Sequence, residues 1–153
     1  MTTVLFGALI DPEVKKIAQE VRDICYKFAM SGSSIDYNFH GKKDMKGMYL
    51  CASQVLREVL RRKGIRAYVC TRINWYCFSH TWVQVGATVV DVTHSQFGSP
   101  DILIAPCKSR ANRVSSFKSY HKGIRARKKQ VKVWNEKEKF NKKMVDRLAS
   151  KVV

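Results

Sequence analysis

SHTWVQVGATVVDVT, residues 79–93, is the stretch that decides the fold, because polar and apolar residues alternate along it on both sides of a glycine. Alternation with a period of two is typical of a β-strand with one buried face. Gly86-Ala87, between the two halves, has the composition of a two-residue hairpin turn. A turn at these residues places Val83 opposite Val90, on the face that belongs to the core. The segment therefore predicts a β-hairpin in an antiparallel sheet.

The other face of this hairpin carries most of its polar residues. In the same register Trp82 lies directly across from Asp91, and His80 is diagonal to Asp91. Diagonal neighbours are roughly 7 Å apart at Cα, so an imidazole and a carboxylate there are within reach of a hydrogen bond. A slip of one residue would move Asp91 to the core face. The alternative to a functional pair is a polar pair on a solvated face of the sheet.

Helices and further strands are expected on both sides of the hairpin. A first helix begins at Asp11-Pro12, a good N-cap and first residue, and its apolar stripe ends at Ser31-Gly32. A second helix covers about residues 48–63 and is closed by Gly64. The fold class is therefore predicted as α+β, with helices packed against an antiparallel sheet. The remaining segments are a polar loop at 31–47, a strand at 66–72, irregular chain at 95–107, a strand at 129–134, and a C-terminal helix behind a capping box of Asn135 and Glu138.

Composition narrows the class of protein. At 153 residues with 45% hydrophobic content, the chain is expected to form one domain with a real core. Its apolar runs are too short to cross a bilayer, so no membrane partner is expected, and the opening MTTVLFGALIDPE lacks the features of a signal peptide. Five cysteines without a CxxC pair predict reduced thiols and a cytoplasmic location. Cys70, Cys77 and a histidine do not have zinc-site spacing, so neither a metal nor another cofactor is expected.

The net charge of +17 is concentrated toward the C-terminus. Residues 1–107 hold 13 Lys and Arg against 9 Asp and Glu, whereas residues 108–153 hold 16 against 3. The second segment therefore carries a net charge of +13 and should attract nucleic acid or an acidic protein. The alternative is a solvated, charged shell over structural elements. The candidate contact residues in this basic extension are Arg113, Lys118, Arg125, Arg127, Lys128 and Lys129.

Cys51 lies near the start of the second expected helix, in the stretch GMYLCASQVLREVLRRKGI. A thiol in the first turn of a helix is close to the positive end of the helix dipole, and a nearby imidazole would lower its pKa further. With Asp91 orienting His80, these residues would follow the nucleophile, base and orienter logic of cysteine hydrolases. The alternative is that Cys51 is a small buried hydrophobic residue, as free cysteines usually are.

Three elements in this order resemble the transglutaminase-like superfamily: LCAS opening a helix that ends in VLRRKGI, then HTW, then VVDVT. The resemblance covers about residues 47–98 and is similar in pattern to small bacterial and phage members, including the leader peptidases of lasso-peptide maturation. It implies a papain-like α+β core within residues 1–107, with the basic extension at 108–153 packed on the same domain. It also implies that Cys51 is the nucleophile, His80 the general base and Asp91 the orienter.

The surroundings of this predicted site are less defined. Trp82 either packs over the imidazole and limits water or is ordinary sheet packing. His94 follows DVT closely and could approach the site, but a position at the surface is expected for it. The backbone N–H of Cys51 is one oxyanion donor to consider. The further candidates for substrate binding or the oxyanion hole are Tyr49, Asn38 and His40.

The leading functional hypothesis is a cysteine peptidase, amidase or deamidase that acts on a protein or peptide through an acyl-enzyme. The second hypothesis belongs to another class: a nucleic-acid or protein binding module that keeps this fold and uses the basic extension. The third hypothesis is a transglutaminase or other acyltransferase, which would use the same residues as the hydrolase.

Overall fold

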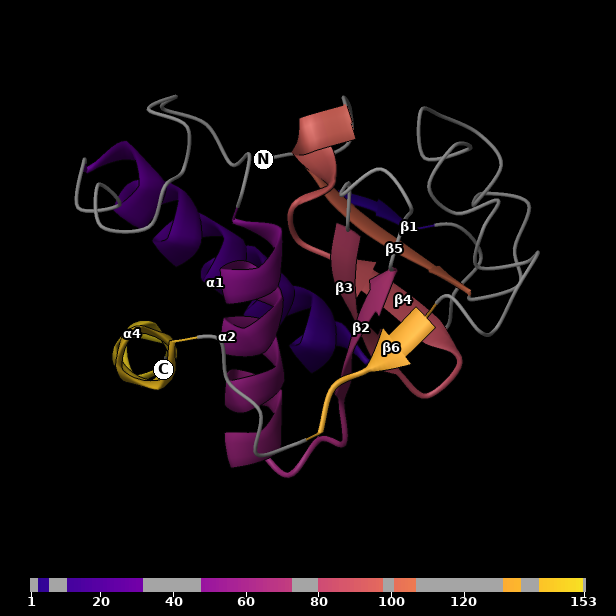
Figure 1. Cartoon of the computed structure of the whole chain (residues 1–153). Coiled ribbons are helices and arrows are strands. Elements are labelled where there is room, and N and C mark those ends of the chain that lie inside the picture. Colours follow the sequence, from indigo (N-terminus) through magenta and orange to yellow (C-terminus); the bar gives the residue numbers. More distant parts are fainter. Residues whose placement is uncertain are drawn as a thin grey trace.

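Helices and a mixed β-sheet form two layers in the computed structural model, with α1 and α2 covering one face of the sheet (Figure 1). The structure describes residues 3–5, 11–31, 48–72, 80–97, 101–106, 131–135 and 141–152. The helices are α1 (Pro12–Met30), α2 (Tyr49–Arg62) and α4 (Lys142–Ala149), with a 3₁₀ turn η2 (His94–Phe97). The strands are β1 (Thr3–Leu5), β2 (Tyr68–Arg72), β3 (His80–Val85), β4 (Thr88–Asp91), β5 (Ile102–Pro106) and β6 (Val131–Val133).

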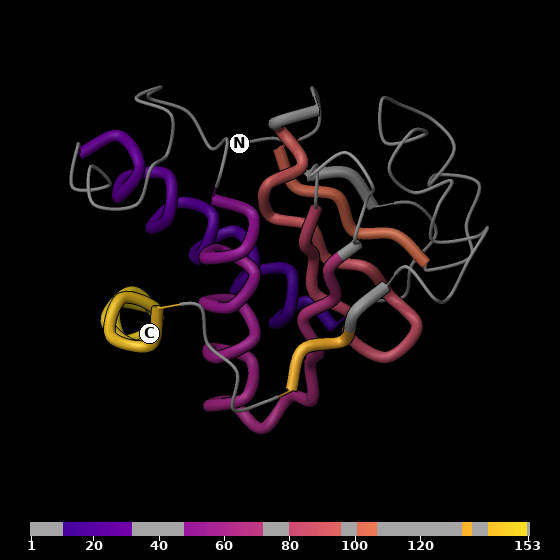
Figure 2. The backbone as a smooth tube through the Cα atoms, in the orientation of Figure 1, coloured from indigo at the N-terminus to yellow at the C-terminus, as the bar shows by residue number. Residues whose placement is uncertain are grey.

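The sheet has the strand order β1-β5-β4-β3-β2-β6. Its four central strands follow one another in sequence and pair antiparallel, so they form a meander that can be followed in Figure 2. At one edge β1 pairs parallel to β5, and at the other edge β6 pairs antiparallel to β2. The α+β class predicted from the sequence is confirmed at this level.

The hairpin formed by β3 and β4 has the register that the sequence predicts. Val83 is paired with Val90 and Val85 with Thr88 across the turn. Gly86 has a φ of 58°, in the left-handed region that a glycine adopts without steric cost. Because the register is fixed, Val83 and Val90 are buried in the main core while His80 and Asp91 lie on the other face.

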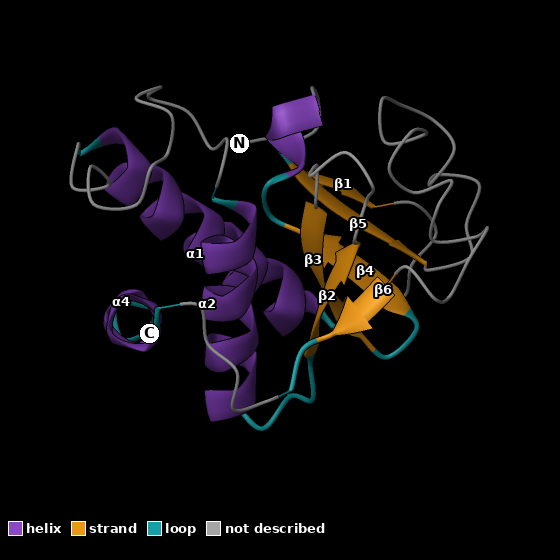
Figure 3. Cartoon of the chain, viewed as in Figure 1, coloured by secondary structure: helices purple, strands orange, loops and turns teal. Residues whose placement is uncertain are grey.

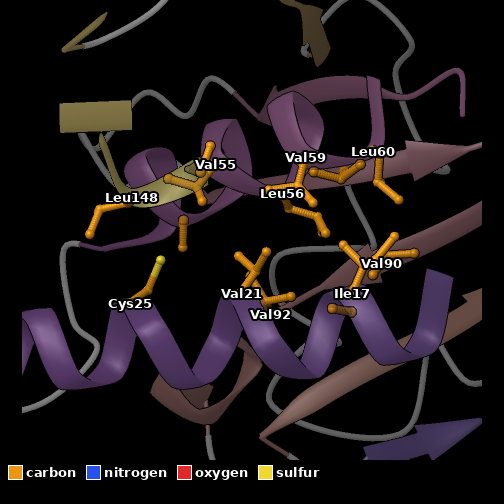
Figure 4. Close-up of a cluster of buried hydrophobic side chains, with 14 of the residues drawn as sticks. Ile17, Val21, Cys25, Val55, Leu56, Val59, Leu60, Val90, Val92 and Leu148 are labelled. Atoms are coloured by element: carbon orange, nitrogen blue, oxygen red, sulfur yellow. The ribbon is translucent and has the colours of Figure 1, made fainter. Parts of the chain in front are cut away.

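The helices α1 and α2 begin and end close to the predicted residues. The side chain of Asp11 accepts a hydrogen bond from the backbone N–H of Glu13 at 2.8 Å and thereby caps α1. Gly64, with a φ of 76°, follows the end of α2. The main core fills the space between α1, α2 and the sheet; in Figure 4, Ile17, Val21 and Cys25 of α1 point toward Val55 and Val59 of α2.

Two sequence predictions need correction. The segment 95–107 is not irregular throughout, because Ile102–Pro106 forms β5, a fully integrated strand between β1 and β4. Prolines on either side of its apolar residues hid this strand. The C-terminal helix is capped by Asn141, whose side chain accepts from the backbone N–H of Met144 at 3.1 Å, and not by Asn135, which lies just after β6.

The described parts of the basic extension join the same sheet and core. β6 extends the sheet next to β2, and α4 packs against α2 on the side away from the sheet (Figure 3). Trp134, after β6, donates from Nε1 to Thr71 Oγ1 at 2.7 Å, and the hydroxyls of Thr71 and Thr81 share a hydrogen bond of 2.8 Å. This chain of hydrogen bonds connects β6 to β2 and then to β3.

Candidate functional site

His80 and Asp91 form a buried pair at the start of β3 and the end of β4. His80 Nε2 and Asp91 Oδ2 are 2.6 Å apart, and both side chains are fully buried. This separation is slightly shorter than the roughly 2.7–2.9 Å that is typical of a charge-assisted N–H···O hydrogen bond. The pair is therefore not the solvated surface pair that the sequence left open as an alternative.

Asp91 is held on its second oxygen as well. Oδ1 accepts from the backbone N–H of Thr93 at 3.0 Å and from its hydroxyl at 3.2 Å. The carbonyl of Val92 accepts from the guanidinium of the buried Arg22 at 2.8 Å, which ties α1 to the chain just after β4. These contacts fix the carboxylate, so Asp91 can hold the His80 ring in one orientation.

The electrostatics of Asp91 favour its ionised form. Burial by itself raises the pKa of Asp91, but the attraction and hydrogen bond of His80, the charge of His94 and the backbone hydrogen bond of Thr93 bring that pKa below its ordinary value. His94 is therefore a neighbour of the pair, and it is buried with 1% of its surface exposed. The expectation that His94 lies at the surface is wrong, because η2 folds it inward soon after the strand.

Two aromatic rings contact the His80 imidazole. Trp82 stacks on it with a centroid separation of 6.2 Å and an interplanar angle of 26°, and the indole is buried. Tyr49, the first residue of α2, lies at 6.0 Å with an angle of 56°. Trp82 and Tyr49, two of the residues predicted from the sequence to surround the site, therefore lie beside the His80 ring. Asn38 and His40 lie outside the described residues.

Cys51 lies in the first turn of α2 as predicted, but its environment differs from the expectation. Its side chain is 1% exposed and belongs to the main hydrophobic core. Burial raises the pKa of Cys51 to about 12, opposite in direction to the lowered pKa that the sequence suggested. The desolvation of this site thus outweighs the helix dipole, and the resting thiol is protonated at neutral pH.

The remaining predicted residues are not placed. The six basic candidates of the extension all fall within residues 107–130, which are outside the described part of the chain. Within the described ranges, no group of three or more His, Cys, Asp or Glu side chains is arranged to hold a metal ion. None of the described helices is both long enough and apolar enough to cross a bilayer.

The site can perform proton transfer. An oriented imidazole can take a proton from a nearby nucleophile and return it to a leaving group, and Asp91 would stabilise the imidazolium that forms.

Sequence reasoning found this pair from the hairpin alone. It missed Arg22, gave no role to Thr93 and favoured a surface position for His94. The position of Thr93, two residues beyond Asp91, is typical of an Asx-type turn and could have indicated its role. Comparison of the chain with protein-family models, with curated proteins and with solved structures gives no match.

Proposed function

We propose that this chain is an acyl-transferring hydrolase of the transglutaminase-like, papain-fold class, in which His80 is the general base and Asp91 its orienter. The observation that carries the proposal is the buried hydrogen bond of 2.6 Å between His80 Nε2 and Asp91 Oδ2. A buried ionisable pair is costly to desolvate, and a functional site is one place where that cost is tolerated.

The orientation of the imidazole supports this role. Asp91 binds Nε2, so Nδ1 is the nitrogen that would accept a proton from the nucleophile. The first turn of α2 is the helical segment beside the pair, because Tyr49 contacts the His80 ring and Ser53 donates to the carbonyl of Thr81 at 3.2 Å. A nucleophile from this turn would attack a carbonyl carbon and form an acyl-enzyme, with its proton passing to His80.

The resemblance names Cys51 as that nucleophile. The acyl-enzyme would be a thioester, released by water as an acid or by an amine as an amide. Hydrolysis of a peptide or side-chain amide is the simplest outcome, because it needs no second binding site.

Two measurements test the proposal. Turnover of p-nitrophenyl acetate is followed in wild type, in His80→Ala and in Asp91→Asn, and the acetylated residue is located by peptide mapping. Iodoacetamide labelling of each cysteine is followed against pH in the same proteins. We expect turnover that both substitutions reduce about 100-fold or more, since a positioned general base contributes at least that much. Turnover that is unchanged in both variants would reject the hydrolase.

The charge of the extension favours one second function. A net charge of +13 in residues 108–153 is suited to neutralising phosphates. This binding function is compatible with the hydrolase. It would appear as an affinity for nucleic acid that falls steeply as the salt concentration rises. The turnover of a neutral ester, in contrast, would not depend steeply on the salt concentration.

A further inference from the structure

Arg22 is a buried cation on α1, beside the end of β4. Its side chain is 7% exposed, and its Nη1 donates to the carbonyl of Val92 at 2.8 Å. The carboxylate that forms its ion pair, that of Asp101, lies 3.7 Å from Nη2 and is partly exposed. Burying a guanidinium is costly unless an opposite charge lies nearby. A neutral carbonyl and one long ion pair do not fully balance this charge, so a second anion is expected near Arg22.

Asp91 is that second anion. Val92, whose carbonyl Arg22 binds, follows Asp91 directly in the chain. Burial lowers the pKa of Arg22, and the charges of Asp101 and then of Asp91 oppose this lowering. The two buried groups therefore attract each other. Because a guanidinium keeps its charge at every pH near neutrality, this attraction is permanent.

The His80–Asp91 pair needs such a permanent charge if His80 is to act as a base. A general base must be uncharged before it accepts a proton, while the electrostatics of Asp91 favour its ionised form. The pair then carries one negative charge on two fully buried side chains. In a medium of low dielectric, such a pair is stabilised by taking up a proton, which would leave His80 unable to accept another. A nearby cation offsets that tendency.

We infer that Arg22 is a positioning residue of the proposed site: it holds the chain that follows Asp91 and balances the charge of Asp91, so that His80 rests as a neutral base. This inference rests on the proposed function. Two other titratable groups face the pair, His94 from η2 and Tyr49 from α2. A histidine side chain can lose its charge near neutral pH and a phenol is uncharged there, so neither supplies a permanent positive charge.

The groups around Arg22 predict which substitutions should have opposite effects. The Tyr26 ring lies under the guanidinium, 5.9 Å from its carbon, and burial raises the pKa of Cys25 well above its ordinary value, so both side chains are neutral at pH 7. Asp101 is charged and opposes Arg22. Removing the charge of Arg22 should therefore favour the protonated form of His80, whereas removing the charge of Asp101 should favour the neutral form.

The test is an NMR titration of the histidine rings, in which His80→Ala assigns the resonances of His80. The pH at which the His80 ring is half protonated is compared in wild type, Arg22→Gln, Arg22→Lys, Asp101→Asn and Asp23→Asn. Asp23 is the matched control, because it is a half-exposed carboxylate next to Arg22 in α1 that pairs with Lys27 at 2.8 Å.

The midpoint of this titration should rise by about 1 pH unit in Arg22→Gln, the lower end of what one nearby charge contributes. It should fall by a smaller amount in Asp101→Asn, because the charge of a partly exposed carboxylate is screened by solvent. Arg22→Lys keeps the charge and Asp23→Asn removes a charge that is already paired, so both should leave the midpoint unchanged.

Turnover of p-nitrophenyl acetate gives a second measurement. The acid limb of its pH profile should move with the midpoint, so Arg22→Gln should be about tenfold slower than wild type at one pH unit below the wild-type midpoint. At high pH, where His80 is neutral in both proteins, the two rates should converge. A residue with a structural role alone would lower turnover at every pH alike.

The outcomes separate this inference from the proposed function. A midpoint that moves in neither Arg22→Gln nor Asp101→Asn, or that moves equally in Arg22→Gln and Arg22→Lys, overturns the inference, and the hydrolase stands if turnover is present. If the midpoints move as expected but the wild type has no turnover, the hydrolase fails while the charge balance stands. If far-UV circular dichroism shows that Arg22→Gln is unfolded, the direction of the shift in Asp101→Asn decides.

Discussion

The cost of replacing Asp91 by asparagine follows from its three hydrogen bonds. The substitution would keep the shape of the side chain but remove its charge, and the new amide nitrogen would face His80. Loss of the charge-assisted bond to His80 costs about 1.5–3 kcal/mol, and weakening of the two bonds from Thr93 adds about 1 kcal/mol each. The expected destabilisation at pH 7 is therefore about 3.5–5 kcal/mol. In a chain of this size it corresponds to a fall in melting temperature of about 7–20 °C.

The same substitution should remove part of the acid sensitivity of the protein. The pKa of Asp91 is lower in the folded state than its ordinary value, so its contribution is complete above an ordinary aspartate pKa of about 3.9. That contribution is lost as the pH falls through the lower folded pKa. The difference in stability between wild type and Asp91→Asn should thus be constant above about pH 5 and shrink in acid.

Urea unfolding at pH 7 and at pH 3 measures both effects. Asp101→Asn is the matched control, because Asp101 is a partly exposed carboxylate whose ion pair with Arg22 is 3.7 Å long. Its removal should cost about 1 kcal/mol, because the buried Arg22 keeps its hydrogen bond to the carbonyl of Val92. If Asp91→Asn costs no more than Asp101→Asn at pH 7, or if the difference between wild type and Asp91→Asn does not shrink at pH 3, the structural account of the buried pair is wrong.

Three further results are expected. Gly86→Val should destabilise the hairpin by about 1–2 kcal/mol in urea unfolding, because a β-branched residue is strained at a φ of 58°; an unchanged midpoint would contradict the turn. Ile104→Ala, in the centre of β5 and fully buried, should cost about 2–5 kcal/mol, and a smaller effect would mean that β5 is not a core strand. Replacing the six basic candidates of the extension by glutamine should weaken the salt dependence of binding to a single-stranded oligonucleotide. The slope of log affinity against log salt concentration, measured by fluorescence anisotropy, should become less steep by about 0.7 for each phosphate that is no longer neutralised. An unchanged slope would exclude a role for these residues in phosphate binding.

Much of the fold could be predicted because its signals are local. The alternation in residues 79–93 indicated both the hairpin and its register, since a shifted register would expose Val83 and Val90 and bury charges without partners. β5 could not be predicted in the same way. It is largely buried and has apolar residues without polar alternation, and the prolines around it are typical of loops.

The candidate site was only partly predictable. The His80–Asp91 pair follows from the register of β3 and β4. The residue of α2 that faces His80 depends instead on how α2 is rotated about its axis relative to the sheet. The four-residue spacing of Cys51, Val55 and Val59 is visible in the sequence and indicates a shared apolar face. Which face of α2 meets β3 could not be decided, because every residue from Cys51 to Arg57 is buried and the helix is covered on several sides.

Trp134 can serve as a fluorescent probe of the contact between the basic extension and the strands of the site. Its indole N–H is hydrogen-bonded to Thr71, and Thr71 is hydrogen-bonded to Thr81. Trp134 belongs to the basic extension, while Thr81 follows His80 directly in β3. Emission from an indole changes when its N–H exchanges a protein acceptor for water. A variant with Trp75 and Trp82 replaced by phenylalanine would leave Trp134 as the sole tryptophan. Its fluorescence would then report whether an anion bound to the extension draws β6 away from the strands that lead to His80.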